Sequence, residues 1–79
     1  MNEAIAKTLL ELRKQNHISQ EKLADAIDSH QVYISEIEKG KKQPSLSILY
    51  SIARFYGMTL TELVSIIESN ITNPTGFAS

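Results

Sequence analysis

The chain has 79 residues, the length of one small domain, and it contains no cysteine, which excludes disulfides and thiolate metal sites. Its 8 basic and 9 acidic residues give a net charge of −1, which argues against tight non-specific binding to a polyanion. It has no apolar run long enough to cross a membrane and no basic-then-apolar leader. Its two histidines alone are too few to hold a metal ion. We therefore expect a cytoplasmic protein without metal, cofactor or membrane partner.

The first helix is predicted over residues 2–15, because Ile5, Leu9 and Leu12 recur at the spacing of one helical face. Asn16 and His17 interrupt this pattern.

Two short helices follow, over residues 20–27 and 31–39. Ser19 can cap the first of them, and Gly40 is a natural residue to end the second. The first has its apolar face at Leu23, Ala24 and Ile27, and the second at Ile34 and Ile37. Two helices too short to be stable alone, with apolar faces on either side of a three-residue break, predict a helix-turn-helix.

The fourth helix is predicted from the cap Ser45 to residue 56, followed by Gly57. Its buried face is predicted to comprise Leu46, Leu49, Ile52 and Ala53. A fifth helix begins with Thr59 and Glu62 in a capping box, and Leu60, Leu63 and Val64 should close the core. The predicted fold is all-α, with five helices in a compact domain at residues 1–69 and a poorly ordered tail at residues 70–79.

The outer face of residues 31–39 carries side chains of the types that read bases. With Ile34 and Ile37 directed inward, the outward residues are Gln31, Val32, Ser35 and Glu36. Glutamine can bond adenine, valine can pack on a thymine methyl, and glutamate can accept from cytosine N4. An ordinary solvated helix face is the alternative, but it does not account for an apolar Val32 outside the core stripe.

Three separated segments then carry a family resemblance: SQEKLA at 19–24, YISEIEKGKKQPSL at 33–46 and SIARFYGMTLTELV at 51–64. In order and spacing they resemble the helix-turn-helix family of the lambdoid phage repressors and the xenobiotic-response-element regulators. The resemblance spans roughly residues 5–64. It implies a lambda-repressor-like domain that binds double-stranded DNA through residues 31–39 and regulates transcription.

The resemblance also implies roles for individual residues. Arg13 and Glu38 would form an internal ion pair, where spacing alone would favour two solvated charges. Contacts to the DNA backbone are expected from Gln20, His30, Tyr33, Lys39, Lys41, Lys42 and Gln43. The alternatives are an exposed Gln20, an exposed His30 and a solvated lysine run at a helix end.

The turn Asp28-Ser29-His30 departs from the family pattern. Asp28 stands where the family usually has glycine, although aspartate can adopt the left-handed conformation. His30 is a poor cap, so the helix could begin one residue early with Ser29 as its cap. The start of the recognition helix stays open at this point.

The end of the fifth helix has more apolar residues than five helices need to bury. Val64, Ile67 and Ile71 are therefore expected to form a dimer interface, as in lambdoid-type domains, so that two copies read a palindromic operator with half-sites about one helical turn apart. Alternatively, Ile71 and Phe77 fold back to cover this surface.

Two functions remain. The first is a sequence-specific transcriptional regulator with no evident small-molecule effector, of the phage-repressor, restriction–modification controller or antitoxin type. The second is a protein-interaction module that retains the fold without binding DNA. The acidic balance and Glu36 favour the second, whereas Gln20, Gln31 and the lysines favour the first. We find no nucleophile–base arrangement and no phosphate-cradling glycine loop, so we do not expect an enzyme.

Overall fold

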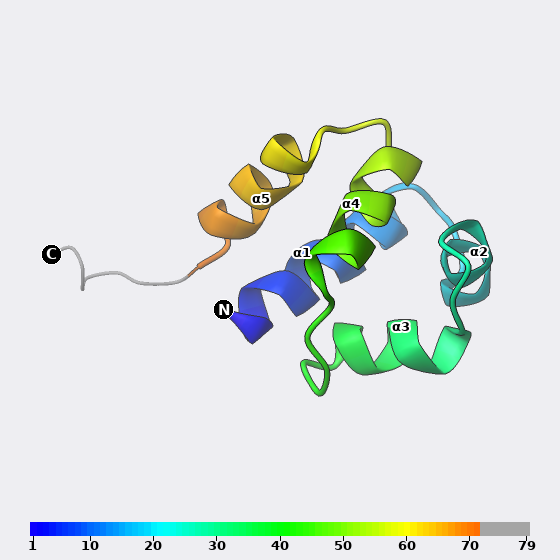
Figure 1. Cartoon of the computed structure of the whole chain (residues 1–79). Helices are drawn as coiled ribbons and strands as arrows, with labels where there is room; N and C mark the ends of the chain where they lie inside the picture. Colours follow the sequence, from blue (N-terminus) through cyan, green and yellow to red (C-terminus); the bar gives the residue numbers. More distant parts are fainter. Residues whose placement is uncertain (72–79) are drawn as a thin grey trace, which may run out of the picture.

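A computed structural model describes residues 1–71, and this part of the chain consists of five helices without a strand. The helices are α1 (Asn2–Gln15), α2 (Gln20–Ala26), α3 (Gln31–Glu38), α4 (Leu46–Phe55) and α5 (Leu60–Ser69). In Figure 1, α1 crosses the middle of the domain and packs against both α3 and α5, while α2 packs on α3 and α4 packs on α5. The predicted all-α, five-helix fold is confirmed, and each helix boundary lies within a residue or so of its expected position.

A single apolar core lies between the five helices. Its largest fully buried side chains are Leu9, Leu23, Ile34, Ile37, Ile52 and Leu63. These residues come from all five helices, and each was predicted to face inward. Because every helix is short, burial of these side chains, rather than intrinsic helix propensity, supplies most of the stability of each one.

Two residues predicted for the core lie at the surface instead. Leu46 is 67% exposed and Val64 is 42% exposed. Leu46 is the first residue of α4, and it shares an outward stripe with Tyr50, four residues later, rather than with the buried Leu49 and Ile52. Spacing alone assigned both residues to the buried face of their helix, but in the packed domain no other helix covers them.

The predicted N-terminal caps are all present. The Ser19 hydroxyl accepts from the Lys22 N–H at 3.0 Å, and the Ser45 hydroxyl accepts from the Ile48 N–H at 3.2 Å. Thr59 and Glu62 form the capping box: the Thr59 hydroxyl accepts from the Glu62 N–H at 3.0 Å, and the Glu62 carboxylate accepts from the Thr59 N–H at 2.8 Å. Each cap satisfies N–H groups that have no partner within the helix.

The helices α1 to α4 end in the same way, with one residue in the left-handed region. These residues are His17 (φ 57°), Asp28 (φ 59°), Gly40 (φ 77°) and Gly57 (φ 75°). After α2, the Ser29 N–H donates to the Ala24 carbonyl at 2.8 Å and the Asp28 N–H donates to the Asp25 carbonyl at 3.2 Å, which is a Schellman motif. The expectation that Asp28 adopts the left-handed conformation is confirmed.

The start of the recognition helix, left open by the sequence, is residue 31. His30 is the N-cap of α3 in an extended conformation (φ −121°, ψ 149°), and its side chain forms no capping hydrogen bond. Ser29 does not act as a side-chain cap, because its backbone belongs to the end of α2. The first turn of α3 therefore presents backbone N–H groups that no side chain caps.

A polar contact that the sequence did not predict joins the middle of α1 to the end of α5. Thr8 is 1% exposed, and its hydroxyl donates to the Ala4 carbonyl at 2.7 Å and accepts from the Asn70 side-chain amide at 2.7 Å. Asn70 is the C-cap of α5 and the first residue of the predicted tail. The signal in the sequence was a threonine on the apolar face of α1, between Ala4 and Leu9. Residues 72–79, including Phe77, lie outside the described part.

We predict that Asp28→Gly raises the free energy of unfolding by up to about 1 kcal/mol, because glycine adopts a positive φ without the steric cost of a Cβ. Urea denaturation monitored by circular dichroism measures the change. The control is Asp25→Gly, which places glycine inside α2 and should lower the free energy of unfolding by about 0.3–0.5 kcal/mol, because aspartate is itself a poor helix former. A loss of stability in Asp28→Gly would mean that the aspartate side chain itself holds the turn.

Candidate nucleic-acid interface

The outer side of α3 brings together the four residues predicted to read bases. Val32 is 68% exposed, Gln31 is exposed, and Ser35 and Glu36 are partly exposed. A shallow surface hollow is lined by Gln20, Gln31, Val32, Ser35, Glu36, Lys39 and Lys41. The helix-turn-helix therefore presents amide, hydroxyl, carboxylate and apolar groups on one face, with lysines at its edge.

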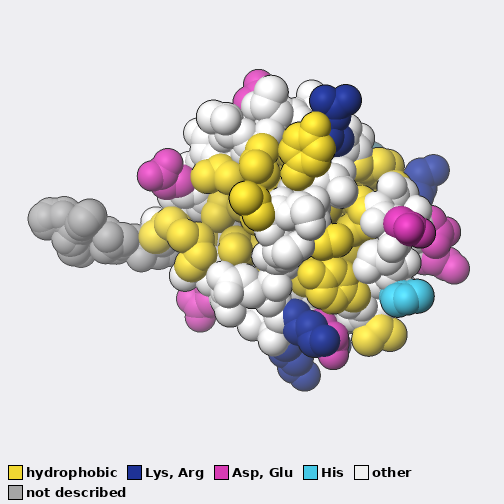
Figure 2. Space-filling view, viewed as in Figure 1, with side chains coloured by type: hydrophobic (Ala, Val, Ile, Leu, Met, Phe, Trp, Pro, Cys, Tyr) yellow, Lys and Arg dark blue, Asp and Glu magenta, His cyan; other side chains and the backbone are white. Residues whose placement is uncertain are grey.

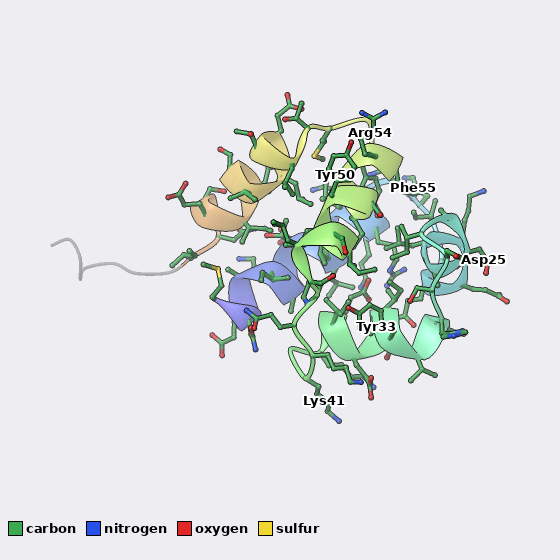
Figure 3. All side chains as sticks on the ribbon, in the orientation of Figure 1. Asp25, Tyr33, Lys41, Tyr50, Arg54 and Phe55 are labelled. Carbon is green, nitrogen blue, oxygen red and sulfur yellow. The ribbon has the colours of Figure 1, made fainter. Side chains whose placement is uncertain are left out.

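The lysines lie at the C-terminal end of this face. Lys39, Lys41, Lys42 and Gln43 are all exposed, and Lys41 projects from the loop after α3 at the lower edge of Figure 3. Figure 2 shows basic side chains gathered at the same edge of the molecule. The remaining candidate backbone contacts are His30, exposed at the start of α3, and Tyr33, whose ring is half-buried against the core.

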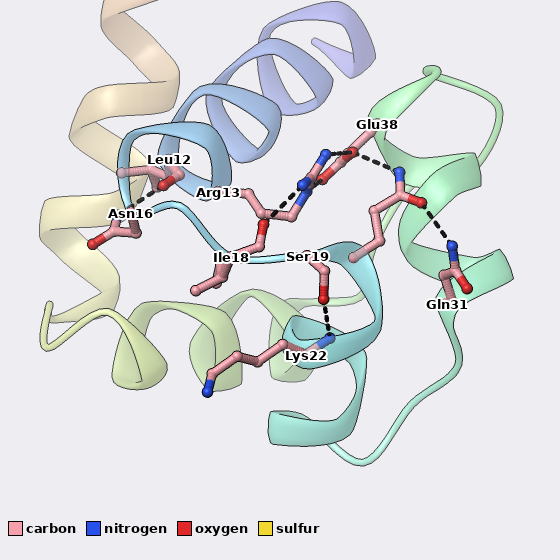
Figure 4. A network of polar contacts seen from close by, with 9 residues as sticks. Leu12, Arg13, Asn16, Ile18, Ser19, Lys22, Gln31 and Glu38 are labelled. Carbon is pink, nitrogen blue, oxygen red and sulfur yellow. Dashed lines mark hydrogen bonds and ion pairs between the residues drawn. The ribbon is translucent and has the colours of Figure 1, made fainter.

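Behind this face, Arg13 and Glu38 form a two-point ion pair, drawn in Figure 4. Arg13 Nε donates to Glu38 Oε2 at 2.7 Å, and Arg13 Nη2 donates to Glu38 Oε1 at 3.0 Å. The side chains are 14% and 4% exposed. A third bond runs from Arg13 Nη1 to the Ile18 carbonyl at 2.9 Å. The arginine thus joins α1 to α3 and to the loop before α2, and the geometry matches the bidentate pair that the resemblance implied.

The ion pair continues outward through two glutamines. Gln20 Nε2 donates to Glu38 Oε1 at 2.9 Å, and Gln31 Nε2 donates to Gln20 Oε1 at 3.3 Å (Figure 4). The family resemblance implied a phosphate contact for Gln20, and its bond to Glu38 was not predicted. This bond uses one of the two Nε2 hydrogens of Gln20, so the first residue of α2 is oriented by an internal carboxylate.

The side-chain amide of Gln31 retains the groups that base recognition needs. One of its two Nε2 hydrogens goes to Gln20, which leaves the other hydrogen and the Oε1 acceptor unused. A donor and an acceptor side by side match the N7 and N6 groups of adenine in the major groove. The bond to Gln20 therefore orients the amide without blocking it.

Electrostatics at the centre of the domain favour one fixed charge state. The hydrogen bond to Glu38 raises the pKa of Arg13 above its ordinary value, so the guanidinium stays charged. Burial raises the pKa of the Tyr56 hydroxyl to about 12, although the nearby Arg13 opposes this shift. The Tyr56 hydroxyl is buried without a hydrogen-bond partner in the described part of the chain. The phenol therefore stays protonated near pH 7.

A second surface of interest is an apolar groove between α1, α4 and α5, lined by Met1, Ile5, Leu49, Val64, Ile67, Glu68 and Ile71. Of the three residues expected in a dimer interface, Val64 is 42% exposed and Ile71 is 39% exposed, at the edges of this groove. Ile67 is only 4% exposed and belongs to the core, where it forms part of the groove floor. Figure 2 shows apolar side chains over much of the α4 and α5 side of the molecule.

Residues 1–71 include no group of three or more side chains arranged to hold a metal ion. None of the helices described is both long and apolar enough to span a membrane.

We predict that Arg13→Met lowers the free energy of unfolding by about 3–5 kcal/mol, because it leaves the Glu38 carboxylate buried without its cation. The double variant Arg13→Met/Glu38→Met should be more stable than Arg13→Met alone, because it removes the orphaned charge. Urea unfolding of both variants measures the difference. A loss below about 1 kcal/mol for Arg13→Met is the value of a solvated surface pair and would contradict this account.

Comparison with known proteins gives one consistent assignment. A helix-turn-helix family model, HTH_3, matches residues 9–63. The chain is 46% identical over 61 residues to the control protein C.MunI of a Mycoplasma species, covering 76% of this chain and 82% of that protein. It is 36% identical over 61 residues to the cryptic phage CTXphi transcriptional repressor RstR of Vibrio cholerae, covering 77% of this chain and 55% of RstR.

Among solved structures, the clp gene regulator ClgR of Corynebacterium glutamicum matches with a TM-score of 0.79 and 25% identity, covering 86% of this chain and 72% of that one. The chain spans about half the length of the first curated relatives it matches, at 50% and 55%. The family model covers most of the described residues, including the whole helix-turn-helix. This chain belongs to the HTH_3 helix-turn-helix family.

Proposed function

We propose that this chain is a sequence-specific DNA-binding transcriptional regulator of the small repressor or controller type. One observation carries the proposal: the exposed amide of Gln31 is linked through Gln20 to the internal Arg13–Glu38 pair. This link orients the Gln31 amide before binding, which would lower the ordering cost of base recognition. The names of the relatives, a control protein and a transcriptional repressor, support the same conclusion.

In this proposal α3 enters the major groove and its outer side chains contact base edges. Gln31 would bond adenine, Val32 would pack on a thymine methyl, and Glu36 would accept from an exocyclic amine, with Ser35 able to donate or accept. Val32 is accessible for this contact, because it is 68% exposed on the outer side of α3.

Contacts to phosphate would come from both sides of α3. His30, Tyr33 and the backbone N–H groups at the start of α3 lie at one end, and Lys39, Lys41, Lys42 and Gln43 lie at the other. One Nε2 hydrogen of Gln20 is bonded to Glu38, so Gln20 would contact phosphate from the start of α2 through its other Nε2 hydrogen. Phosphate contacts fix the register of the helix on the duplex, and base contacts supply the specificity.

The apolar groove between α1, α4 and α5 supports a homodimer that binds a palindromic operator. Val64 and Ile71 expose apolar surface at its edges, with Met1 beside them at 69% exposure. A symmetric contact between two copies would cover both patches at once. Two recognition helices would then reach half-sites about 34 Å apart.

The similarity to C.MunI over 82% of its length favours the controller type over the other small regulators.

Selection from a random pool of double-stranded DNA tests the function, and binding of the selected duplex at several salt concentrations follows. We predict a palindromic consensus and a steep salt dependence. For Gln31→Ala we expect a loss of about 1–3 kcal/mol on that duplex and relaxed preference at one position of each half-site. The control is Gln15→Ala, an exposed glutamine at the end of α1. Failure to enrich any sequence, even at low salt, would instead favour a protein-interaction module.

The dimer has its own test. We predict that Val64→Asp shifts sedimentation toward the monomer at micromolar concentration, because a charge in the interface stays without a partner there. Ser65→Asp places the same charge on the exposed neighbouring position of α5 and should leave the dimer intact. Ile67 is unsuitable for this test, because aspartate at a 4% exposed core position would unfold the domain. A wild-type protein that sediments as a monomer would refute the interface.

A further inference from the structure

Glu36 is the one acidic residue among those that line the hollow on the outer side of α3. The other carboxylate of this helix, Glu38, is internal and bonded to Arg13. A carboxylate on a surface that meets the DNA backbone is repelled unless a cation accompanies it. The nearest cation in the described residues is Lys42, whose Nζ lies 3.7 Å from Glu36 Oε1.

The main chain holds Lys42 near Glu36. The N–H groups of Lys41 and Lys42 both donate to the Glu36 carbonyl, at 2.9 Å and 3.3 Å, where Gly40 turns the chain with a φ of 77°. The way α3 ends therefore brings the main chain of Lys42 close to that of Glu36, so that their side chains can meet.

The pair is weak in the free protein and is placed to strengthen on binding. The side chains of Lys42 and Glu36 are 57% and 36% exposed, and water screens pairs of this kind almost completely. When a duplex displaces that water, the local dielectric constant falls and the attraction between the charges grows. Lys42 then offsets the repulsion between Glu36 and the phosphates.

We propose that Glu36 and Lys42 enter the DNA interface as one pair, in which Glu36 accepts a hydrogen bond from a base amino group such as cytosine N4 and Lys42 is its counter-ion. This inference rests on the proposed DNA-binding function, and it replaces the independent phosphate contact proposed above for Lys42 with the role of counter-ion to Glu36. Because the charges of Glu36 and Lys42 cancel, the pair would favour one base without strengthening binding to DNA of any other sequence. That agrees with a domain whose net charge is −1.

A double-mutant cycle with Glu36→Gln and Lys42→Met tests the pairing, using the duplex selected from the random pool and a scrambled duplex of equal length. Lys42→Met should weaken binding to the selected duplex about tenfold or more in the wild-type background, and no more than about twofold when residue 36 is already glutamine. Glu36→Gln should reduce discrimination at one base position about tenfold. Both variants should melt like the wild type, because the backbone bonds around Gly40 remain.

Lys41→Met is the matched control, because Lys41 is the exposed neighbour of Lys42 and forms no ion pair in the described part of the chain. It should cost the same in both backgrounds and lower the salt dependence by about one ion. If Lys42→Met behaves like this control, Lys42 is an independent phosphate contact and the inference is overturned. If the wild-type protein binds neither duplex, the proposed function fails, and the pairing fails with it.

Discussion

The buried pair between Arg13 and Glu38 is the constraint on which the rest of this small domain depends. Two charges with side chains 14% and 4% exposed are costly to bury, and only a complete set of partners offsets that cost. The partners come from α1, from the loop at Ile18, and from Gln20 at the start of α2. Apolar contacts among Ile and Leu side chains tolerate sliding, whereas a bidentate pair does not. The pair therefore fixes the position of α3 relative to α1. It lies directly behind the exposed face of the helix-turn-helix.

The same carboxylate connects the interior to the surface. Glu38 accepts from Gln20, and Gln20 accepts from Gln31, so an internal charge orients a solvent-exposed amide. Side chains on an isolated helix lose rotamer freedom when they bind, and part of that loss is already incurred here before any ligand arrives. If α3 reads bases as proposed, the internal pair would help to orient Gln31 without contacting the DNA itself.

The distribution of charge matters more than its sum. A net charge of −1 gives no long-range attraction to DNA, yet Lys39, Lys41 and Lys42 are concentrated where α3 ends. In the proposed interface, phosphate contacts from the lysines would strengthen binding to every sequence alike, so selectivity would have to come from the nearly neutral outer side of α3. The carboxylate of Glu36 would add to it, since it would disfavour any duplex that offers it no donor.

The sequence by itself determined the number of helices, their caps and most of the core, because these depend on neighbours within four residues. Ser19 and the Thr59–Glu62 box are local hydrogen-bonding motifs, and Ile34 and Ile37 follow from helical periodicity. With a family resemblance added, it also indicated the Arg13–Glu38 pair.

Only the tertiary structure decided what depends on distant partners. The bond between Gln20 and Glu38 spans 18 residues and that between Thr8 and Asn70 spans 62, and neither has a periodic signature. Leu46 and Val64 are exposed and Ile67 is buried. These differences depend on whether another helix covers each residue in the packed domain. Periodicity identifies an apolar face, but its width and its covering element are properties of the packed domain.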